Sequence, residues 1–429
     1  MRSTIFLLIF FTMYFQCVSQ ARFDSVLIGI LEIKADSVLL KVLNNKEEYK
    51  CQLIYTQIIR DKHNVPSFQN FYYNVDSKNY YNPASTVKLP LAILALEKLN
   101  DLNQPGINKF TAVLFDSAYE GQVKEHTDST SETGLPSIAQ FIRKAFIVSD
   151  NDAYNRLYEF VGQATINNRL HEAGYPATRI TRRFMGFTLE QNRRNNPVRF
   201  LNANGRVIYR QPMVVNTDSF DFSEIHKMGN AHYNRSGQLV NTPIDFTTHN
   251  NLPLEDLQQM LQSTMFPGSV PLSHRFRLKE EDYKFIYQYL SQYPSETNYP
   301  LYDTAKYYDS YVKFFFRAGS RKIPSYIRVF NKVGWAYGCM TDVSYIVDFK
   351  NKVEYMITAT IYVNKDGILN DDKYEYETIA LPFFYRVNQA IYDFELNRER
   401  KYKPVLDRFK IKYDVRNETG RKPIVEVDN

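Results

Sequence analysis

Residues 325–363 read SYIRVFNKVGWAYGCMTDVSYIVDFKNKVEYMITATIYV. Three runs in this stretch, at 326–333, 343–349 and 353–362, are rich in the β-branched and aromatic residues that strands prefer. Residues 348–352 are mostly polar and make a tight turn between the last two runs. The stretch therefore predicts three successive strands of an antiparallel sheet.

The two ends of the chain add strands and helices to this sheet. Residues 49–60 alternate apolar and polar side chains, and residues 68–75 are the expected partner strand. Residues 23–45 carry apolar side chains at helical spacing, in one helix or two, and residues 377–398 form a closing helix. We expect one antiparallel sheet, built from both chain ends and flanked by helices.

The middle of the chain is mostly helical. Helices are predicted at 83–99, 136–161 (in two pieces that meet near Ser149), 253–263 and 279–292. The first of them is too apolar for a surface helix and is expected to be buried. Residues 177–242 lose this periodicity and contain two hairpin turns, at 202–205 and 234–237. The sequence thus predicts an α+β fold, with a mostly helical middle domain packed against the antiparallel sheet.

The first 20 residues have the pattern of a secretory signal peptide. Arg2 gives a positive start, and residues 5–15 form an apolar run that is too short to span a bilayer. Cleavage near Ser19 would release an exported protein, periplasmic or extracellular. A lipid anchor on Cys17 is the less favoured alternative, because bulky residues precede this cysteine.

The rest of the chain is expected to form one domain over residues 21–400, with an insertion at about 195–248. A polar tail at 401–429 follows it. The net charge of +6 is dispersed along the chain, so we expect no nucleic-acid partner. No segment after the signal peptide is apolar for long enough to cross a membrane, and we expect a monomer.

The cysteines and histidines predict neither a disulfide framework nor a metal site. Cys51 and Cys339 are the two cysteines left after the signal peptide, and we expect free thiols. The seven histidines are scattered, without ligand spacing. Because no phosphate-binding or dinucleotide-binding loop occurs either, no metal and no cofactor is expected.

One short motif brings a hydroxyl and an amine together. In Ser-Thr-Val-Lys, residues 85–88, the side chains three positions apart share one face of a helix, so Lys88 can reach Ser85. A serine hydroxyl becomes a nucleophile when a neighbouring base takes its proton, and a buried lysine can be that base. The motif alone is weak, because residues 310–313 match it again.

Two further motifs follow in the chain. Ser-Asp-Asn at 149–151 lies between two predicted helices, where Ser149 can relay a proton and Asn151 can orient Lys88 or the substrate amide. Lys-Val-Gly at 332–334 lies in a predicted strand, where Lys332 adds positive charge beside a substrate carboxylate. Gly334 marks a close approach of another group, and the N–H of Trp335 would complete an oxyanion hole with that of Ser85.

Together and in this order, the three motifs resemble the signature of class A β-lactamases and penicillin-binding proteins. The similarity extends to the flanking residues 82–90, 146–155 and 332–343, and covers roughly residues 50–398. It implies that Ser85 is the nucleophile, with Lys88 and Ser149 as its proton-transfer partners. It also implies a small-molecule substrate, either a β-lactam or a peptide derived from peptidoglycan.

Two departures from this family's pattern bear on the chemistry. Val333 stands where the family has a hydroxyl residue that helps to bind the substrate carboxylate. Residues 178–184 resemble the start of the loop that carries the deacylating glutamate in class A enzymes, but Met185 stands at the expected glutamate position. Glu190 is the candidate replacement if the loop is longer here.

Three hypotheses follow for the function. The first is a class A β-lactamase that hydrolyses the lactam ring through a Ser85 acyl-enzyme. The second is a related serine hydrolase that acts on a peptidoglycan peptide or another amide or ester and deacylates slowly. The third is a binding protein on the same fold. The joint presence of five residues argues against it: Ser85, Lys88, Ser149, Asn151 and Lys332.

Overall fold

The computed structural model describes residues 21–417 and 420–427, and the predicted signal peptide with Cys17 lies outside the described residues. One six-stranded sheet has the order β1-β3-β2-β15-β14-β13 and is antiparallel throughout. Its strands are β1 (Arg22–Phe23), β2 (Gln52–Arg60), β3 (Pro66–Val75), β13 (Ile327–Ala336), β14 (Cys339–Asp348) and β15 (Val353–Tyr362). Because β2 pairs with β15, the two chain ends meet in the middle of one sheet, which confirms the α+β prediction.

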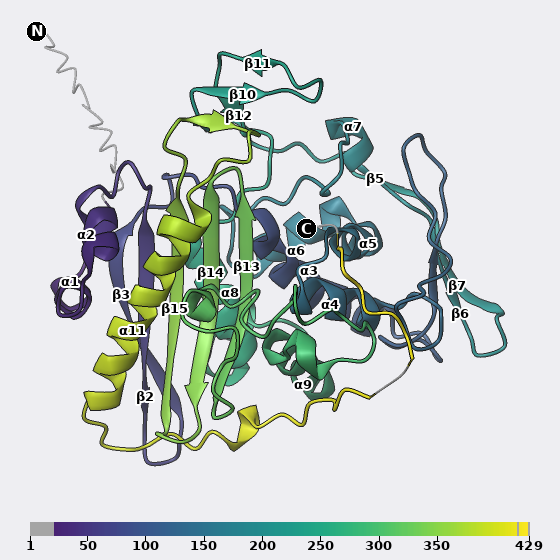
Figure 1. Cartoon of the computed structure of the whole chain (residues 1–429). Helices are drawn as coiled ribbons and strands as arrows, with labels where there is room; N and C mark the ends of the chain where they lie inside the picture. The colour runs from purple at the N-terminus through teal and green to yellow at the C-terminus, as the bar shows by residue number, and fades with distance from the viewer. Residues whose placement is uncertain (1–20, 418–419, 428–429) are drawn as a thin grey trace, which may run out of the picture.

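The two faces of this sheet carry different helices. In Figure 1, α11 (Leu381–Asn397) lies across one face, beside α1 (Ser25–Glu32) and α2 (Ser37–Asn44). Helix α8 (Leu254–Met265) contacts β14, β15 and β2 from the other face. Alternate side chains of one strand therefore enter different cores, as Met356 and Ile357 do.

The helical part of the molecule is built around α3 (Lys88–Leu102). Its residues 88–97 are all buried, and a 3₁₀ turn at Ala84–Val87 leads into it. The surrounding helices are α4 (Ile138–Ile147), α5 (Asn151–Val161), α6 (Gln163–Glu172) and α9 (Glu280–Ser291). The predicted break near Ser149 is the junction between α4 and α5, and the buried first helix is confirmed.

The remaining elements are short strands and two four-residue helices in the connections between the longer elements, most of them between α6 and α8. They are β4 (Val113–Phe115), α7 (Leu189–Asn192), β5 (Arg194–Asn195), β6 (Val198–Leu201), β7 (Val207–Gln211), β8 (Val214–Val215), β9 (Lys227–Met228), β10 (Ala231–Tyr233), β11 (Leu239–Val240), β12 (Ile244–Asp245), α10 (Phe314–Arg317) and β16 (Ile368–Leu369). Both predicted hairpin turns are present, joining β6 to β7 and β10 to β11.

The structure also bears on the expectations about membrane-spanning helices and about the two cysteines. Among the described residues, no helix combines the length and the apolar character that a membrane span requires. Cys51 and Cys339 are buried with free thiols, as predicted. Burial raises the pKa of the Cys339 thiol to about 11, which keeps it protonated and unreactive at neutral pH.

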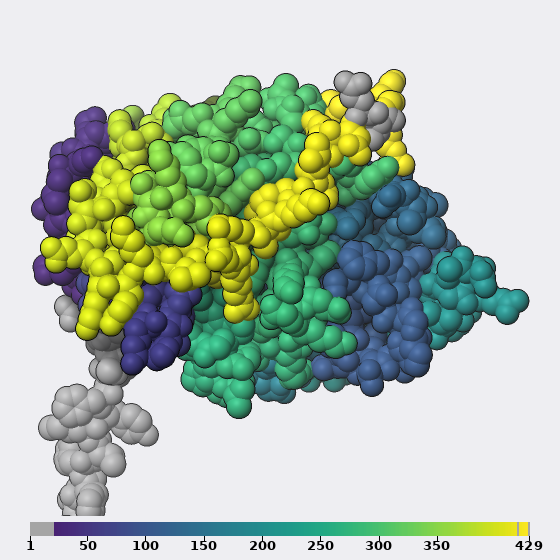
Figure 2. Space-filling view, turned by 90° about the horizontal axis from the view of Figure 1, so that it is seen from below, coloured from purple at the N-terminus to yellow at the C-terminus, as the bar shows by residue number. Residues whose placement is uncertain are grey.

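The C-terminal segment crosses the surface from the sheet to the helical part, as Figure 2 shows. It was predicted to be a polar tail, but Leu406 and Phe409 are buried in the main core. The ring of Phe409 lies 4.9 Å from that of Tyr345 and 5.7 Å from that of Phe266 (centroid to centroid). The segment is therefore part of the fold, and it connects the two halves of the molecule.

We expect Phe409→Ala to lower the free energy of unfolding by about 3 kcal/mol, because the truncation leaves a cavity among packed rings. Urea denaturation of the two proteins measures this difference. Val415→Ala is the matched control in the same segment, since Val415 is 80 % exposed, and it should change stability by less than about 0.5 kcal/mol. Equal effects of the two substitutions would contradict a packed C-terminal segment.

Candidate active site

Ser85 stands in a tight turn at the start of the central helix. The turn begins at Asn82, whose side-chain Oδ1 accepts a hydrogen bond from the N–H of Ala84 (2.9 Å). Ala84 has φ +42°, a left-handed conformation that is uncommon for residues other than glycine. The following 3₁₀ turn places Ser85 at the N-terminal end of α3, where backbone N–H groups and the helix dipole favour a developing negative charge.

Lys88 lies one turn after Ser85 and is fully buried. Its Nζ donates to Ser85 Oγ (2.8 Å) and to Asn151 Oδ1 (2.7 Å). It also contacts the main-chain oxygen of Ser149, and the Ser149 hydroxyl lies 3.3 Å away. The structure thus brings the first two motifs together around one amine.

Ser149 links the helical part to the sheet. It has φ +69° at the junction of α4 and α5, where Asp150 caps α5 by accepting a hydrogen bond from the N–H of Ala153 (2.8 Å). Lys332 of β13 donates to Ser149 Oγ (2.9 Å), so the third motif joins the other two. Burial lowers the pKa of Lys332 well below its usual value, and the charge of Lys88 lowers it further.

Strand β13 touches the nucleophile turn at Gly334. A Cβ at this position would lie 2.5 Å from the carbonyl oxygen of Pro83 and 2.9 Å from the amide nitrogen of Ser85. No side chain fits that space, which explains the glycine. Val333, the next residue back along the strand, points to the opposite face and is buried in the core that α11 covers, so it presents no polar group to the site.

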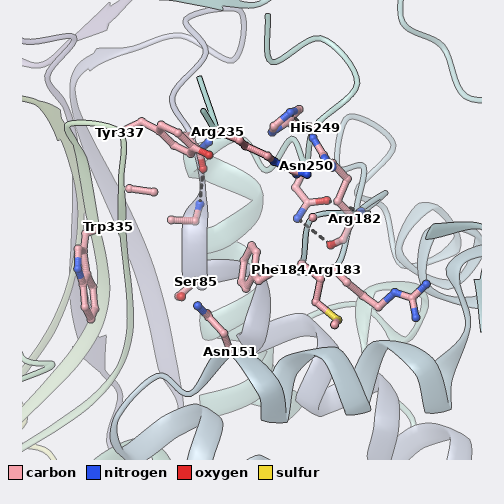
Figure 3. A pocket seen from close by; sticks show the side chains of 15 residues that line it. Ser85, Asn151, Arg182, Arg183, Phe184, Arg235, His249, Asn250, Trp335 and Tyr337 are labelled. Carbon is pink, nitrogen blue, oxygen red and sulfur yellow. Dashed lines mark hydrogen bonds between the residues drawn. The ribbon is translucent and has the colours of Figure 1, made fainter. Parts of the chain in front are cut away.

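A cavity of about 420 Å³ opens in front of Ser85 (Figure 3). It is large enough for a drug-sized molecule. Its walls come from the nucleophile turn, the start of α5, the loop at 182–186, the turn after β10, the segment before α8 and the end of β13. They are lined by Asn82, Ala84, Ser85, Asn151, Arg182, Arg183, Phe184, Met185, Gly186, Arg235, His249, Asn250, Trp335, Ala336 and Tyr337.

Glu190 is not part of this cavity, and the hypothesis that it replaces the deacylating glutamate is wrong for this conformation. Its side chain lies on α7, is 53 % exposed and forms an ion pair with Arg194. Met185 does line the cavity, as expected from its place in the loop. Among the described residues, no Asp or Glu lines the cavity.

Two contacts with α5 hold the loop that carries Met185 in place. Asn155 of α5 accepts a hydrogen bond from the N–H of Phe184 (2.7 Å), and Arg183 forms a buried ion pair with Glu159 (2.8 Å). The Phe184 ring therefore lies 5.3 Å from the Lys88 amine, where it shields that amine from water.

Several residues of the cavity were not anticipated from the sequence. Arg182 and Arg235 come from the aperiodic part of the chain, and His249 and Asn250 come from the segment between it and α8. No pattern in these segments indicates which side chains meet. Asn82 was within the quoted flank of the first motif, and Phe184 was within the quoted loop at 178–184. Their neighbourhood was therefore a usable signal, although their roles were not predicted.

The second Ser-x-x-Lys match has a structural role. Ser310 donates to the main-chain oxygen of Ser320, and Lys313 donates to oxygens of Leu290 (2.7 Å), Val329 (3.0 Å) and Asn331 (2.6 Å). The main-chain N–H of Lys313 donates to the carbonyl oxygen of Ser310 (3.0 Å), but no hydrogen bond between their side chains is recorded among the described residues. This lysine therefore holds β13 to α9 and supplies no base to its serine.

Comparisons with known proteins agree with the geometry. Residues 37–207, which include the first two motifs and the loop at 182–186, match the model of the β-lactamase enzyme family. The search of curated proteins finds no match.

Distant likenesses occur among solved structures. The chain resembles a β-lactamase from Streptosporangium roseum (14 % identity, TM-score 0.46, covering 83 % of this chain and 98 % of that one). It also resembles β-lactamases from Desulfarculus baarsii (15 %, 0.44, 87 % and 98 %) and Sphaerobacter thermophilus (13 %, 0.42, 83 % and 96 %). Likenesses this distant carry no argument about function.

We expect Gly334→Ala to destabilise the protein by about 1–3 kcal/mol, because the added methyl group overlaps backbone atoms that cannot move independently. Thermal unfolding at equal protein concentration measures the loss. Gly268→Ala serves as the control, since a Cβ there meets no atom within 4 Å. A Gly334 variant as stable as the control would show that β13 does not press on the nucleophile turn.

Proposed function

We propose that the chain is a serine hydrolase of the β-lactamase enzyme family, whose model matches residues 37–207. In this proposal Ser85 opens the ring of a β-lactam, or attacks a related amide, and holds the product as an acyl-enzyme. The observation that supports this most directly is the position of a buried amine, Lys88 Nζ, 2.8 Å from Ser85 Oγ. A nucleophile with a base in hydrogen-bond reach is the arrangement that acyl transfer requires.

Acylation begins with a proton transfer from Ser85 to Lys88. A neutral amine has two N–H groups and one lone pair. Asn151 Oδ1 and the main-chain oxygen of Ser149 can accept both N–H groups, which leaves the lone pair for the hydroxyl proton of Ser85. Lys88 is fully buried, and its charge and that of Lys332 disfavour each other, which contributes to the lowered pKa of Lys332.

The attack forms a bond from Ser85 Oγ to the carbonyl carbon, and the carbon–nitrogen bond of the amide then breaks. The leaving nitrogen takes a proton from Ser149 Oγ, which regains one from Lys88 at 3.3 Å. Lys332 at 2.9 Å from Ser149 Oγ favours release of that proton. The N–H groups of Ser85 and Trp335 are the proposed donors to the oxyanion.

Release of the acyl group is the slow step in this proposal. Hydrolysis of an acyl-enzyme requires a base that activates water. Among the described residues, the cavity is lined by no carboxylate, and burial together with the charge of Arg182 lowers the pKa of its only lining histidine, His249, to about 3. This favours the second hypothesis, a penicillin-recognising hydrolase with a long-lived acyl-enzyme, over an efficient class A β-lactamase.

We expect Ser85→Ala to abolish covalent labelling by benzylpenicillin, because Ser85 is the one serine among the described residues that line the cavity, and Lys88 lies beside it. Intact-mass spectrometry of the mature protein measures the adduct. Ser310→Ala is the matched control from the second Ser-x-x-Lys match, and it should label like the unsubstituted protein. Labelling that survives Ser85→Ala would assign the nucleophile elsewhere.

We expect the benzylpenicillin adduct to persist after free penicillin is removed, and its lifetime to stay within about twofold in Glu190→Gln. The reason is that the Glu190 carboxylate pairs with Arg194 outside the cavity. Following the adduct mass over hours in both proteins measures the two lifetimes. Rapid turnover by the unsubstituted protein, slowed at least about tenfold by the substitution, would restore Glu190 as the deacylating base.

A further inference from the structure

The cavity has two ends with different chemistry. In Figure 3, Ser85 and Asn151 lie at one end, and Arg235, His249 and Asn250 lie at the other. The proposed acylation uses only the first end. The second is formed by residues that belong to none of the three motifs.

Arg182 is held firmly at this second end. Asn250 Oδ1 accepts a hydrogen bond from its N–H (2.9 Å), and Asn250 Nδ2 donates to its main-chain oxygen (3.3 Å). Its guanidinium contacts His249 Nε2 and donates to the main-chain oxygen of Phe187 (3.3 Å). Neither partner of the guanidinium carries a negative charge.

Arg235 enters the cavity from the turn between β10 and β11. Its guanidinium lies against Gly186, where a Cβ would meet the Nη2 atom at 2.8 Å and Nη1 at 3.0 Å. Arg235 is exposed on its other side. Glycine at 186 therefore lets the guanidinium lie flat on the loop that borders the cavity.

The two arginines face one cavity without an acidic neighbour. Within the part of the chain that the structure describes, neither guanidinium forms an ion pair, and no Asp or Glu lines the cavity. The pKa of Arg182 is lowered by burial and further by the charge of Arg235, which shows that the two positive charges repel each other. An anion placed between them would relieve this repulsion.

We propose that this end of the cavity is an anion subsite, and that the natural substrate carries a second negatively charged group, such as a carboxylate, on the part of the molecule away from the reacting carbonyl. This group is distinct from the carboxylate that is common to all penicillins and is therefore present in both compounds of the test below. Planar guanidinium groups bind carboxylates through paired hydrogen bonds, and Arg182 and Arg235 both present such groups. The inference rests on the proposed function, since it names the substrate class of the same site.

The test compares two compounds that differ in one group: benzylpenicillin and the same penicillin with a carboxylate on its side-chain carbon. Binding is measured by calorimetry in the Ser85→Ala variant, which cannot be acylated at Ser85. We expect the carboxylated compound to bind roughly tenfold more tightly, the gain typical of hydrogen bonds to a charged group. Added salt should reduce the ratio, because Arg235 is exposed.

Two charge reversals in this background locate the effect. Arg235→Glu should bring the ratio of the two affinities to one or below. Arg210→Glu is the matched control, since it reverses the same charge on the exposed β6–β7 hairpin, outside the cavity, and should leave the ratio unchanged. Equal affinity for the two penicillins, no binding of either, or an equal effect of the two reversals would overturn the anion subsite. Labelling of Ser85 in the unsubstituted protein tests the proposed function separately.

Discussion

The contact between Gly334 and the nucleophile turn sets the position of everything else in the site. Because β13 lies directly on the backbone of residues 83–86, the sheet and the helical part meet at Ser85 with no side chain between them. Lys332, two residues earlier on the same strand, then reaches Ser149, and Ser149 reaches Lys88. The hydrogen bond between Lys332 and Ser149 and the one between Ser149 and Lys88 each join segments far apart in the chain. A shift of one half against the other would therefore move Lys332 and Trp335 of β13 away from Ser149 and Ser85 of the helical part.

The two Ser-x-x-Lys sequences show how environment decides the role of a motif. Lys88 and Lys313 are both buried, and burial costs an amine its hydration unless hydrogen bonds replace it. Lys313 satisfies its amine with three oxygens of α9 and β13, and its pKa falls to about 7 through burial. Lys88 instead has the serine of its own motif as a neighbour. Only the second arrangement connects a base to a nucleophile.

The sequence predicted those parts of the structure whose signal is local. The strand at 353–362 was predicted with the bounds that β15 has, because β-branched and aromatic side chains fill it. Helix α6 was missed, since Ile166 and Leu170 are among its few buried apolar residues and give almost no periodicity. The burial of Phe409 was missed because residues 401–412 are rich in Lys and Arg, which is typical of an exposed tail. The meeting of Arg182 with Arg235 depends on loop conformation, which no spacing in the sequence encodes.

The charges on the cavity wall connect the two proposals. A carboxylate beside an acyl-enzyme can accept a proton from water, whereas a guanidinium remains protonated and cannot. The proton-transfer residues Lys88, Ser149 and Lys332 are buried behind Ser85 and do not line the cavity. The described lining of the cavity in front of Ser85 contains no Asp or Glu, but it contains two groups that attract an anion, Arg182 and Arg235. A cavity of this composition favours substrates whose acyl group carries a negative charge. Its described lining supplies no carboxylate to activate water, so the acyl-enzyme is expected to be long-lived.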